Sequence, residues 1–173
     1  ARGYADNPYH NWYHGFEVLW FAFFILRSSP TVMQQFTHLN VLTLLVAALC
    51  HDIDHSGFTN TFECLRGSRL ARVYNDKSVL ENHHAYSTFE ILRRSDCDIL
   101  VNLEQADKTA FRKSMIQAIL STDMVHHFKM IKRLDTMEPC SLQAINFEVE
   151  ADWQFLIDII VHAAELSNQA LAH

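Results

Sequence analysis

"LCHDIDHSGFTN", residues 49–60, places two histidines and two aspartates within five consecutive positions, 51–55. They directly follow the apolar run "VLTLLVAA", residues 41–48, which is typical of a buried helix. Burying four polar or charged side chains behind such a run costs several kcal/mol unless they pair with one another or coordinate a metal ion. The stretch therefore predicts a metal site at the end of a core helix.

The composition predicts one compact, all-α domain. The chain has 173 residues, of which 49% are hydrophobic, so it can bury one sizeable core. It contains only 4 Gly and 3 Pro, and its apolar residues recur every three or four positions, which favours helices throughout. The net charge of −6, with 14 Lys and Arg in no dense run, excludes the basic stripe of a nucleic-acid-binding protein.

The cysteines and the apolar runs indicate a cytoplasmic protein. The four cysteines are too widely spaced for a metal knuckle, and they fit reduced thiols packed in helices. The apolar runs "FEVLWFAFFIL" and "LNVLTLLVAALC" are shorter than the ~20 residues of a membrane span, so we expect core helices and no membrane segment. The chain starts without methionine and ends inside an expected helix, so we expect a piece of a longer protein whose other regions could still attach it to a membrane.

Apolar spacing predicts helices over residues 8–27, 39–52, 79–94, 108–133 and from 152 to the end. Ser78 is the expected N-cap of the third helix, with Glu81 completing a capping box. Polar loops are expected over residues 66–78, 94–107 and 134–150.

Four further motifs carry possible ligands: "YHNWYH" (9–14), "LENHH" (80–84), "STDMVHH" (121–127) and "VHAAELSN" (161–168). Each also fits an ordinary structural role. His10 and His14, four apart on one expected helix face, could be surface or packing residues. Asp123 could pair with a lysine further along its helix, and His126 and His162 could be satisfied core histidines.

Taken in order along the chain, these motifs and "HDIDHSGFTN" resemble the successive signatures of the class I cyclic nucleotide phosphodiesterase catalytic domain. That domain is a compact multi-helix fold related to the HD-type metal-dependent phosphohydrolases. The resemblance runs from Tyr9 to Asn168. It implies that residues 1–173 are part of a single catalytic domain, whose base-pocket portion lies beyond His173.

The resemblance implies a two-metal hydrolase that opens cAMP or cGMP to the 5'-monophosphate, with a metal-bridging hydroxide as the nucleophile. It assigns His10 as the general acid that protonates the leaving 3'-oxygen. The remaining matched positions fall into three groups. The ligands of a first metal, zinc, are His14, His51, Asp52 and Glu165. The residues around a second metal, magnesium or alternatively manganese, which Asp52 also binds, are His55, Glu81 and Thr122. The residues lining the substrate pocket are Asn60, Asp123, Met124 and Asn168.

Three positions depart from the family pattern. Ser56 and Gln169 replace prolines that usually follow "HDxDH" and "LSN", and Glu165 replaces the usual aspartate. Two other functions stay open at this point: an HD-type phosphohydrolase acting on another nucleotide, and a nucleotide-binding or scaffold module without turnover. The oligomeric state and the choice between cAMP and cGMP are not encoded in these motifs.

Overall fold

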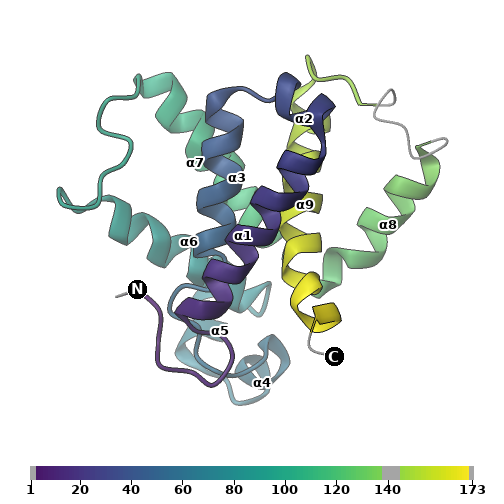
Figure 1. Ribbon diagram of the computed structural model, residues 1–173. Helices are drawn as coiled ribbons and strands as arrows, with labels where there is room; N and C mark the ends of the chain where they lie inside the picture. The colour runs from purple at the N-terminus through teal and green to yellow at the C-terminus, as the bar shows by residue number, and fades with distance from the viewer. Residues whose placement is uncertain (1–2, 138–144, 172–173) are drawn as a thin grey trace.

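The computed structural model describes residues 3–137 and 145–171, with side chains described as far as Ser167. Within those residues every regular element is helical (Figure 1). The elements are α1 Trp12–Ser28, α2 Pro30–Gln35, α3 His38–Cys50, α4 Asn60–Leu65, α5 Arg69–Tyr74, α6 Val79–Leu92, α7 Gln105–Leu120, the 3-10 turn η1 Met124–His126, α8 His127–Thr136 and α9 Glu150–Leu171. The predicted all-α class is confirmed.

Helices α1, α3 and α9 pack against one another at the centre of the molecule. Helices α6 and α7 flank α3 on one side, α8 lies beyond α9 on the other, and the short α4 and α5 lie below (Figure 1). Each central helix contributes a fully buried alanine to the core, namely Ala22, Ala47 and Ala164. Side chains this small let the three backbones approach closely, so the packing fixes the relative positions of the helices.

Helix α1 begins at Trp12, later than expected. The side chain of Asn11 accepts hydrogen bonds from the backbone N–H groups of Tyr13 and His14, which makes Asn11 the N-cap. His10 therefore precedes the helix, and the prediction that His10 and His14 share a helix face is wrong.

The capping box predicted at the start of α6 is also wrong. Ser78 does occupy the N-cap position, but its backbone is left-handed and its side chain makes no capping hydrogen bond. Glu81 instead accepts hydrogen bonds from Asn60, which is distant in sequence. A local pattern cannot reveal this long-range partner.

The single helix expected over residues 108–133 is broken in two. Helix α7 ends at Leu120, and α8 begins only at His127. Between them the hydroxyl of Ser121 donates a hydrogen bond to the carbonyl of Ala118. The side chain of Asp123 caps η1 by accepting from Val125 N–H. Such side chains compete with helical hydrogen bonds and so end the helix.

Short helices were the other errors of the prediction. Helix α5 occupies the middle of the expected loop 66–78, where Ser68 caps it and Asn75 ends it in a left-handed conformation. Helices α2 and α4 were not predicted, and α9 starts at Glu150, two residues early. Of the expected loop 134–150, residues 138–144 lie outside the described residues, and so does Cys140. Among the described helices, none combines the length and apolar content needed to cross a bilayer.

Candidate metal centre

Three central helices bring four ligand-type side chains together at one end of the bundle. His14 lies in the first turn of α1, His51 is the C-cap of α3, Asp52 follows it, and Glu165 lies in α9. The Nε2 atoms of His14 and His51 are 3.2 Å apart. Glu165 Oε2 lies 3.0 Å from the first and 2.7 Å from the second. Asp52 Oδ2 lies 3.3 Å from the first and 3.5 Å from the second.

Two carboxylate oxygens of this group, Asp52 Oδ2 and Glu165 Oε2, are buried and make no hydrogen bond of regular geometry among the described residues, although the two imidazoles lie beside them. Buried acceptors without partners are rare and costly in folded proteins. The ligand atoms of His14, His51 and Asp52 all lie within 4.8 Å of one another, and imidazole nitrogens with a carboxylate oxygen suit a divalent metal. Glu165 is close to both imidazoles but is not a member of this set of three. The residues therefore fit a cation, and His14, His51 and Asp52 are geometrically able to share one.

The histidine orientation supports this fit. His51 Nδ1 donates to the carbonyl of Ala48 at 2.8 Å, so its Nε2 faces the cluster. A backbone carbonyl that fixes one ring nitrogen commonly orients the other toward a metal.

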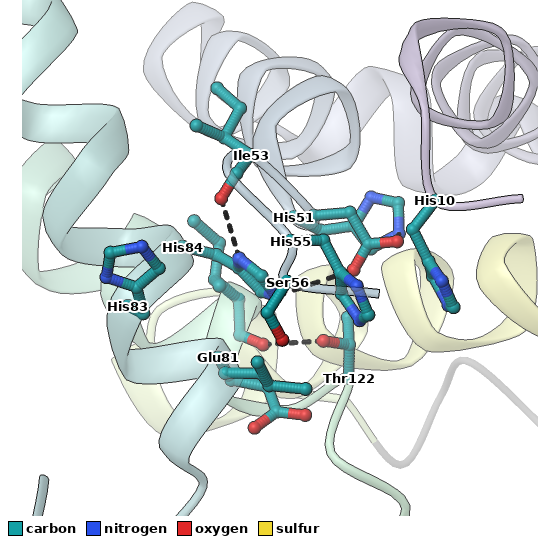
Figure 2. A network of polar contacts seen from close by, with 12 residues as sticks. His10, His51, Ile53, His55, Ser56, Glu81, His83, His84 and Thr122 are labelled. Atoms are coloured by element: carbon teal, nitrogen blue, oxygen red, sulfur yellow. Dashed lines mark hydrogen bonds and ion pairs between the residues drawn. The ribbon is translucent and has the colours of Figure 1, made fainter. Parts of the chain in front are cut away.

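A second group shares Asp52 and lies beside the first (Figure 2). It consists of Asp52, His55 and His84, all buried. His84 Nδ1 donates to the carbonyl of Ile53 at 2.7 Å, and His84 Nε2 lies 3.7 Å from Asp52 Oδ1. Asp52 thus stands between two possible cation positions. His84 was not among the predicted site residues, although it belongs to "LENHH", one of the motifs with possible ligands.

The two groups differ in the charge they favour. Burial acts to lower the pKa of His14 and His51, but the carboxylates of Asp52 and Glu165 outweigh it and raise these pKa values to about 9 and about 10. The same imidazoles keep the pKa of Glu165 at about 2 despite its burial, and that of Asp52 well below its usual range. The first group is therefore arranged to hold positive charge.

At the second group, burial dominates. It lowers the pKa of His55 to about 4 and that of His84 to about 3. Both rings are neutral at pH 7, but they present different groups to the site. His84 donates from Nδ1, so its Nε2 keeps a lone pair that can bind a cation or accept a hydrogen bond. His55 Nδ1 accepts from the backbone N–H of Gly57 at 2.9 Å, so its Nε2 carries the proton and acts as a donor.

Next to the second group, Glu81 accepts from Asn60 Nδ2 at both carboxylate oxygens, at 3.1 and 2.9 Å. Asn60 Oδ1 accepts in turn from Leu80 N–H at 2.9 Å, which fixes the amide. Burial raises the pKa of Glu81 to about 7, and the nearby Asp123 adds to the effect. Glu81 therefore changes charge near neutral pH.

The remaining predicted residues differ in exposure. Thr122 donates to the carbonyl of Ile119, Asp123 is buried, and Met124 is 55% exposed. The side chain of Asn168 lies outside the described residues, as does that of Gln169.

His10 reaches the site from the segment before α1. Its ring stacks on His55 with centroids 3.8 Å apart and an interplanar angle of 12° (Figure 2). Burial lowers the pKa of His10 below its usual value. The ring is held 5.9 Å from that of His14, beside the cluster and outside it.

Comparison with known proteins identifies relatives of the chain. The sequence profile of the 3'5'-cyclic nucleotide phosphodiesterase family matches residues 9–172. The chain is 38% identical over 167 residues to the 3',5'-cyclic-nucleotide phosphodiesterase regA of Dictyostelium discoideum, covering 95% of this chain and 20% of that protein. It is 36% identical over 171 residues to the 3',5'-cyclic-AMP phosphodiesterase 4C of Mus musculus, covering 96% of this chain and 25% of that protein.

A solved structure is similar over the same range. The phosphodiesterase domain of the RhoPDE fusion protein from the choanoflagellate Salpingoeca rosetta matches with a TM-score of 0.89 and 37% identity, over 96% of this chain and 52% of that one. The chain thus spans about half of that domain, and a quarter or less of these two relatives.

Proposed function

Because the chain belongs to the 3',5'-cyclic nucleotide phosphodiesterase family, we propose that the protein hydrolyses a nucleoside 3',5'-cyclic phosphate to the 5'-monophosphate. The observation that carries the proposal is a pair of buried carboxylate oxygens, on Asp52 and Glu165, that lie beside two imidazoles and make no hydrogen bond of regular geometry among the described residues. A hydrolase of this class uses metal charge at the same place as its substrate's phosphate.

We assign a first cation, zinc, to His14, His51, Asp52 and Glu165, since nitrogen and carboxylate donors at tight spacing suit zinc. The second cation, magnesium or manganese, would share Asp52, with His55, Glu81 and Thr122 around it. When bound, the two cations lower the pKa of coordinated water and draw negative charge from the phosphoryl oxygens.

His10 supplies the proton that the leaving 3'-oxygen needs as its bond to phosphorus breaks. The stacked ring of His55 holds the His10 imidazole in one orientation. A lowered pKa makes the His10 imidazolium a stronger acid, although less of it is present at neutral pH. An anionic substrate beside the ring favours its protonated form and so offsets that loss.

Other side chains position the reactants. Asn60 holds the carboxyl of Glu81, whose pKa of about 7 lets it take up or release a proton near neutral pH. Asp123, Met124 and Asn168 line the substrate pocket in this proposal. The cytoplasmic location and the single-domain assignment stay predictions.

The test is to incubate the full-length protein with cAMP, cGMP and a linear phosphodiester in the presence of Mg²⁺. We expect the 5'-monophosphate from a cyclic nucleotide and no comparable turnover of the linear ester. Hydrolysis of a different nucleotide alone would favour an HD-type phosphohydrolase. If metal-loaded protein binds a cyclic nucleotide without turning it over, the alternative of a nucleotide-binding or scaffold module is favoured.

A further inference from the structure

The turn between α3 and α4 carries two residues of the site and has an unusual backbone. Residues 54–59 follow the metal-binding doublet, include His55 and lead directly into Asn60. Asp54 and Gly57 both have positive φ, at 60° and 81°. Backbone hydrogen bonds from Asp54 and His55, and one from Asn7 Nδ2 to the carbonyl of His55, hold the first part of the turn. The part that runs from Ser56 into α4 depends on further side-chain contacts.

A buried acid on α4 provides one such contact. Glu63 is fully buried, and Ser56 Oγ donates to its Oε1 at 2.8 Å. Arg66 donates to both carboxylate oxygens, from Nε at 3.1 Å and from Nη2 at 2.9 Å. Burial alone would raise the pKa of Glu63, but hydrogen bonds from Ser68, Ser56 and Arg66 outweigh it and lower the pKa. The carboxylate therefore stays charged and its hydrogen bonds are charge-assisted.

Arg66 ties the same turn to α4 a second time. Its guanidinium lies over the rings of Phe58, in the turn, and Phe62, in the helix, at 5.0 and 5.5 Å from their centroids. The two rings stack at 4.6 Å. The ion pair of Glu63 and Arg66 thus contacts the turn at two points, Ser56 and Phe58, and links both to α4.

We propose that Ser56, Glu63 and Arg66 form a brace that positions His55 and Asn60, and that this brace does in this chain what a rigid proline at position 56 would do. Ser56 directly follows His55, which stacks on His10, and precedes Asn60, which holds Glu81. Among the described residues, the hydrogen bonds of the three brace side chains run to one another, to Ser68 and to Phe58 N–H, not to the candidate cation ligands, so we treat the three as positioning residues. Only the expected change in kcat rests on the proposed function; the expected change in Mn²⁺ affinity does not.

The test compares Ser56→Ala, Ser56→Thr and Thr59→Ala in the full-length protein. Ser56→Ala removes the hydroxyl but keeps the Arg66–Glu63 ion pair, so the fold is retained, as circular dichroism will check. Ser56→Thr keeps a hydroxyl. Thr59→Ala is the matched control, because Thr59 caps the same helix through Phe62 N–H and does not contact Glu63.

Two readouts are used. Protein saturated with Zn²⁺ is titrated with Mn²⁺ under electron paramagnetic resonance, and kcat is measured on the cyclic nucleotide. Residues that orient a metal site typically alter its affinity by about 10-fold to 100-fold when they are lost. We expect Ser56→Ala to raise the Mn²⁺ Kd and lower kcat by about 10-fold, with zinc content unchanged. Ser56→Thr should restore both values, and Thr59→Ala should alter neither.

The proposal is overturned if Ser56→Ala has the Mn²⁺ Kd and kcat of the unmutated protein. It is also overturned if Thr59→Ala loses as much Mn²⁺ affinity and kcat as Ser56→Ala, since a general destabilisation of α4 would then explain both. Failure of Ser56→Thr to restore Mn²⁺ affinity would also overturn it. If the unmutated protein binds Mn²⁺ but turns over no cyclic nucleotide, the proposed function fails, and the Mn²⁺ titration alone decides the brace.

Discussion

Glu165, where the family resemblance implies an aspartate, brings a longer carboxylate against both imidazoles. Its Oε2 atom already lies within 3.0 Å of both imidazoles, so the extra methylene is accommodated where α9 stands. We expect Glu165→Ala to lose the first cation, and Glu165→Asp to keep a carboxylate that is about 1.5 Å shorter, and with it part of the cation. Zinc per chain by elemental analysis measures both, and full zinc in Glu165→Ala would rule out this ligand.

The two histidines of "YHNWYH" should separate by role. His10 lies beside the cluster and His14 within it, so His10→Asn should keep zinc and lose roughly 10²–10⁴-fold in kcat, the usual contribution of a general acid. His14→Asn should lose zinc as well. A cyclic nucleotide analogue with a better leaving group is the control, because it should rescue His10→Asn alone. Equal zinc loss in the two variants would contradict these roles.

At the residue level, sequence alone predicted most of the candidate cluster. His51 and Asp52 stood out because burying them unpaired is expensive, while His14 and Glu165 depended on the resemblance. His84 was missed because its Nδ1 partner is a backbone carbonyl, that of Ile53, which no sequence pattern displays. Glu81 was assigned a capping role because its true partner, Asn60, is distant in sequence.

Helices α7 and α9 meet along a buried polar seam. Ser114 donates to Gln154, and the amide groups of Gln154 and Gln117 donate to Asp158 at 2.7 and 2.8 Å. Burial raises the pKa of Asp158 to about 6, against the opposing effects of these amides and of Arg133 and His126. The folded protein therefore binds this proton more tightly than the unfolded chain does.

This shift sets a pH dependence with a definite sign. The stability that Asp158 contributes is full below about pH 4 and is lost as the pH rises through about 6. Asp158→Asn removes this titration, although it also replaces one of the two oxygens that accept from Gln117 and Gln154. The free energy of unfolding of the variant, relative to that of the unmutated protein, should therefore gain roughly 2 kcal/mol between pH 4 and pH 7.5. Thermal melts of both proteins across this range measure it, with Asp135→Asn on the exposed side of α8 as the control. A gain independent of pH would contradict the assignment.

Among the elements, length decided what could be predicted. Helices α1, α3, α6 and α9 are long enough for their apolar spacing to repeat, and all four were expected. Helices α2, α4 and α5 have six residues each, less than two turns, so no period is visible. The break between α7 and α8 depends on the caps of Ser121 and Asp123, whose residue types also occur inside helices.

For the whole molecule, the cluster ties together the three central helices α1, α3 and α9, so binding a cation should stabilise the entire fold. Linkage gives about 4 kcal/mol when the free cation is at 1,000 times its Kd. We expect a chelator to lower the Tm of the unmutated protein. Asp52→Asn removes the shared ligand, so it should have the lower Tm already and respond little to the chelator.

Differential scanning fluorimetry with and without chelator measures this, together with metal content. The matched control is Asp135→Asn, which leaves the cluster intact and should respond as the unmutated protein does. Two cations per chain in Asp52→Asn would contradict the shared role of Asp52.

The alanines at the helix crossings have a consequence for ion size. Ala22, Ala47 and Ala164 are fully buried members of the core on α1, α3 and α9, the helices that bear or precede the four candidate ligands. Moving these helices apart would open the core, so we expect the frame to resist widening. Calcium prefers six to eight oxygens at about 2.3–2.6 Å in a flexible cage, whereas zinc accepts four ligands near about 2.0 Å. A rigid frame with two fixed imidazoles therefore discriminates against large ions by their radius, before any difference in ligand chemistry contributes.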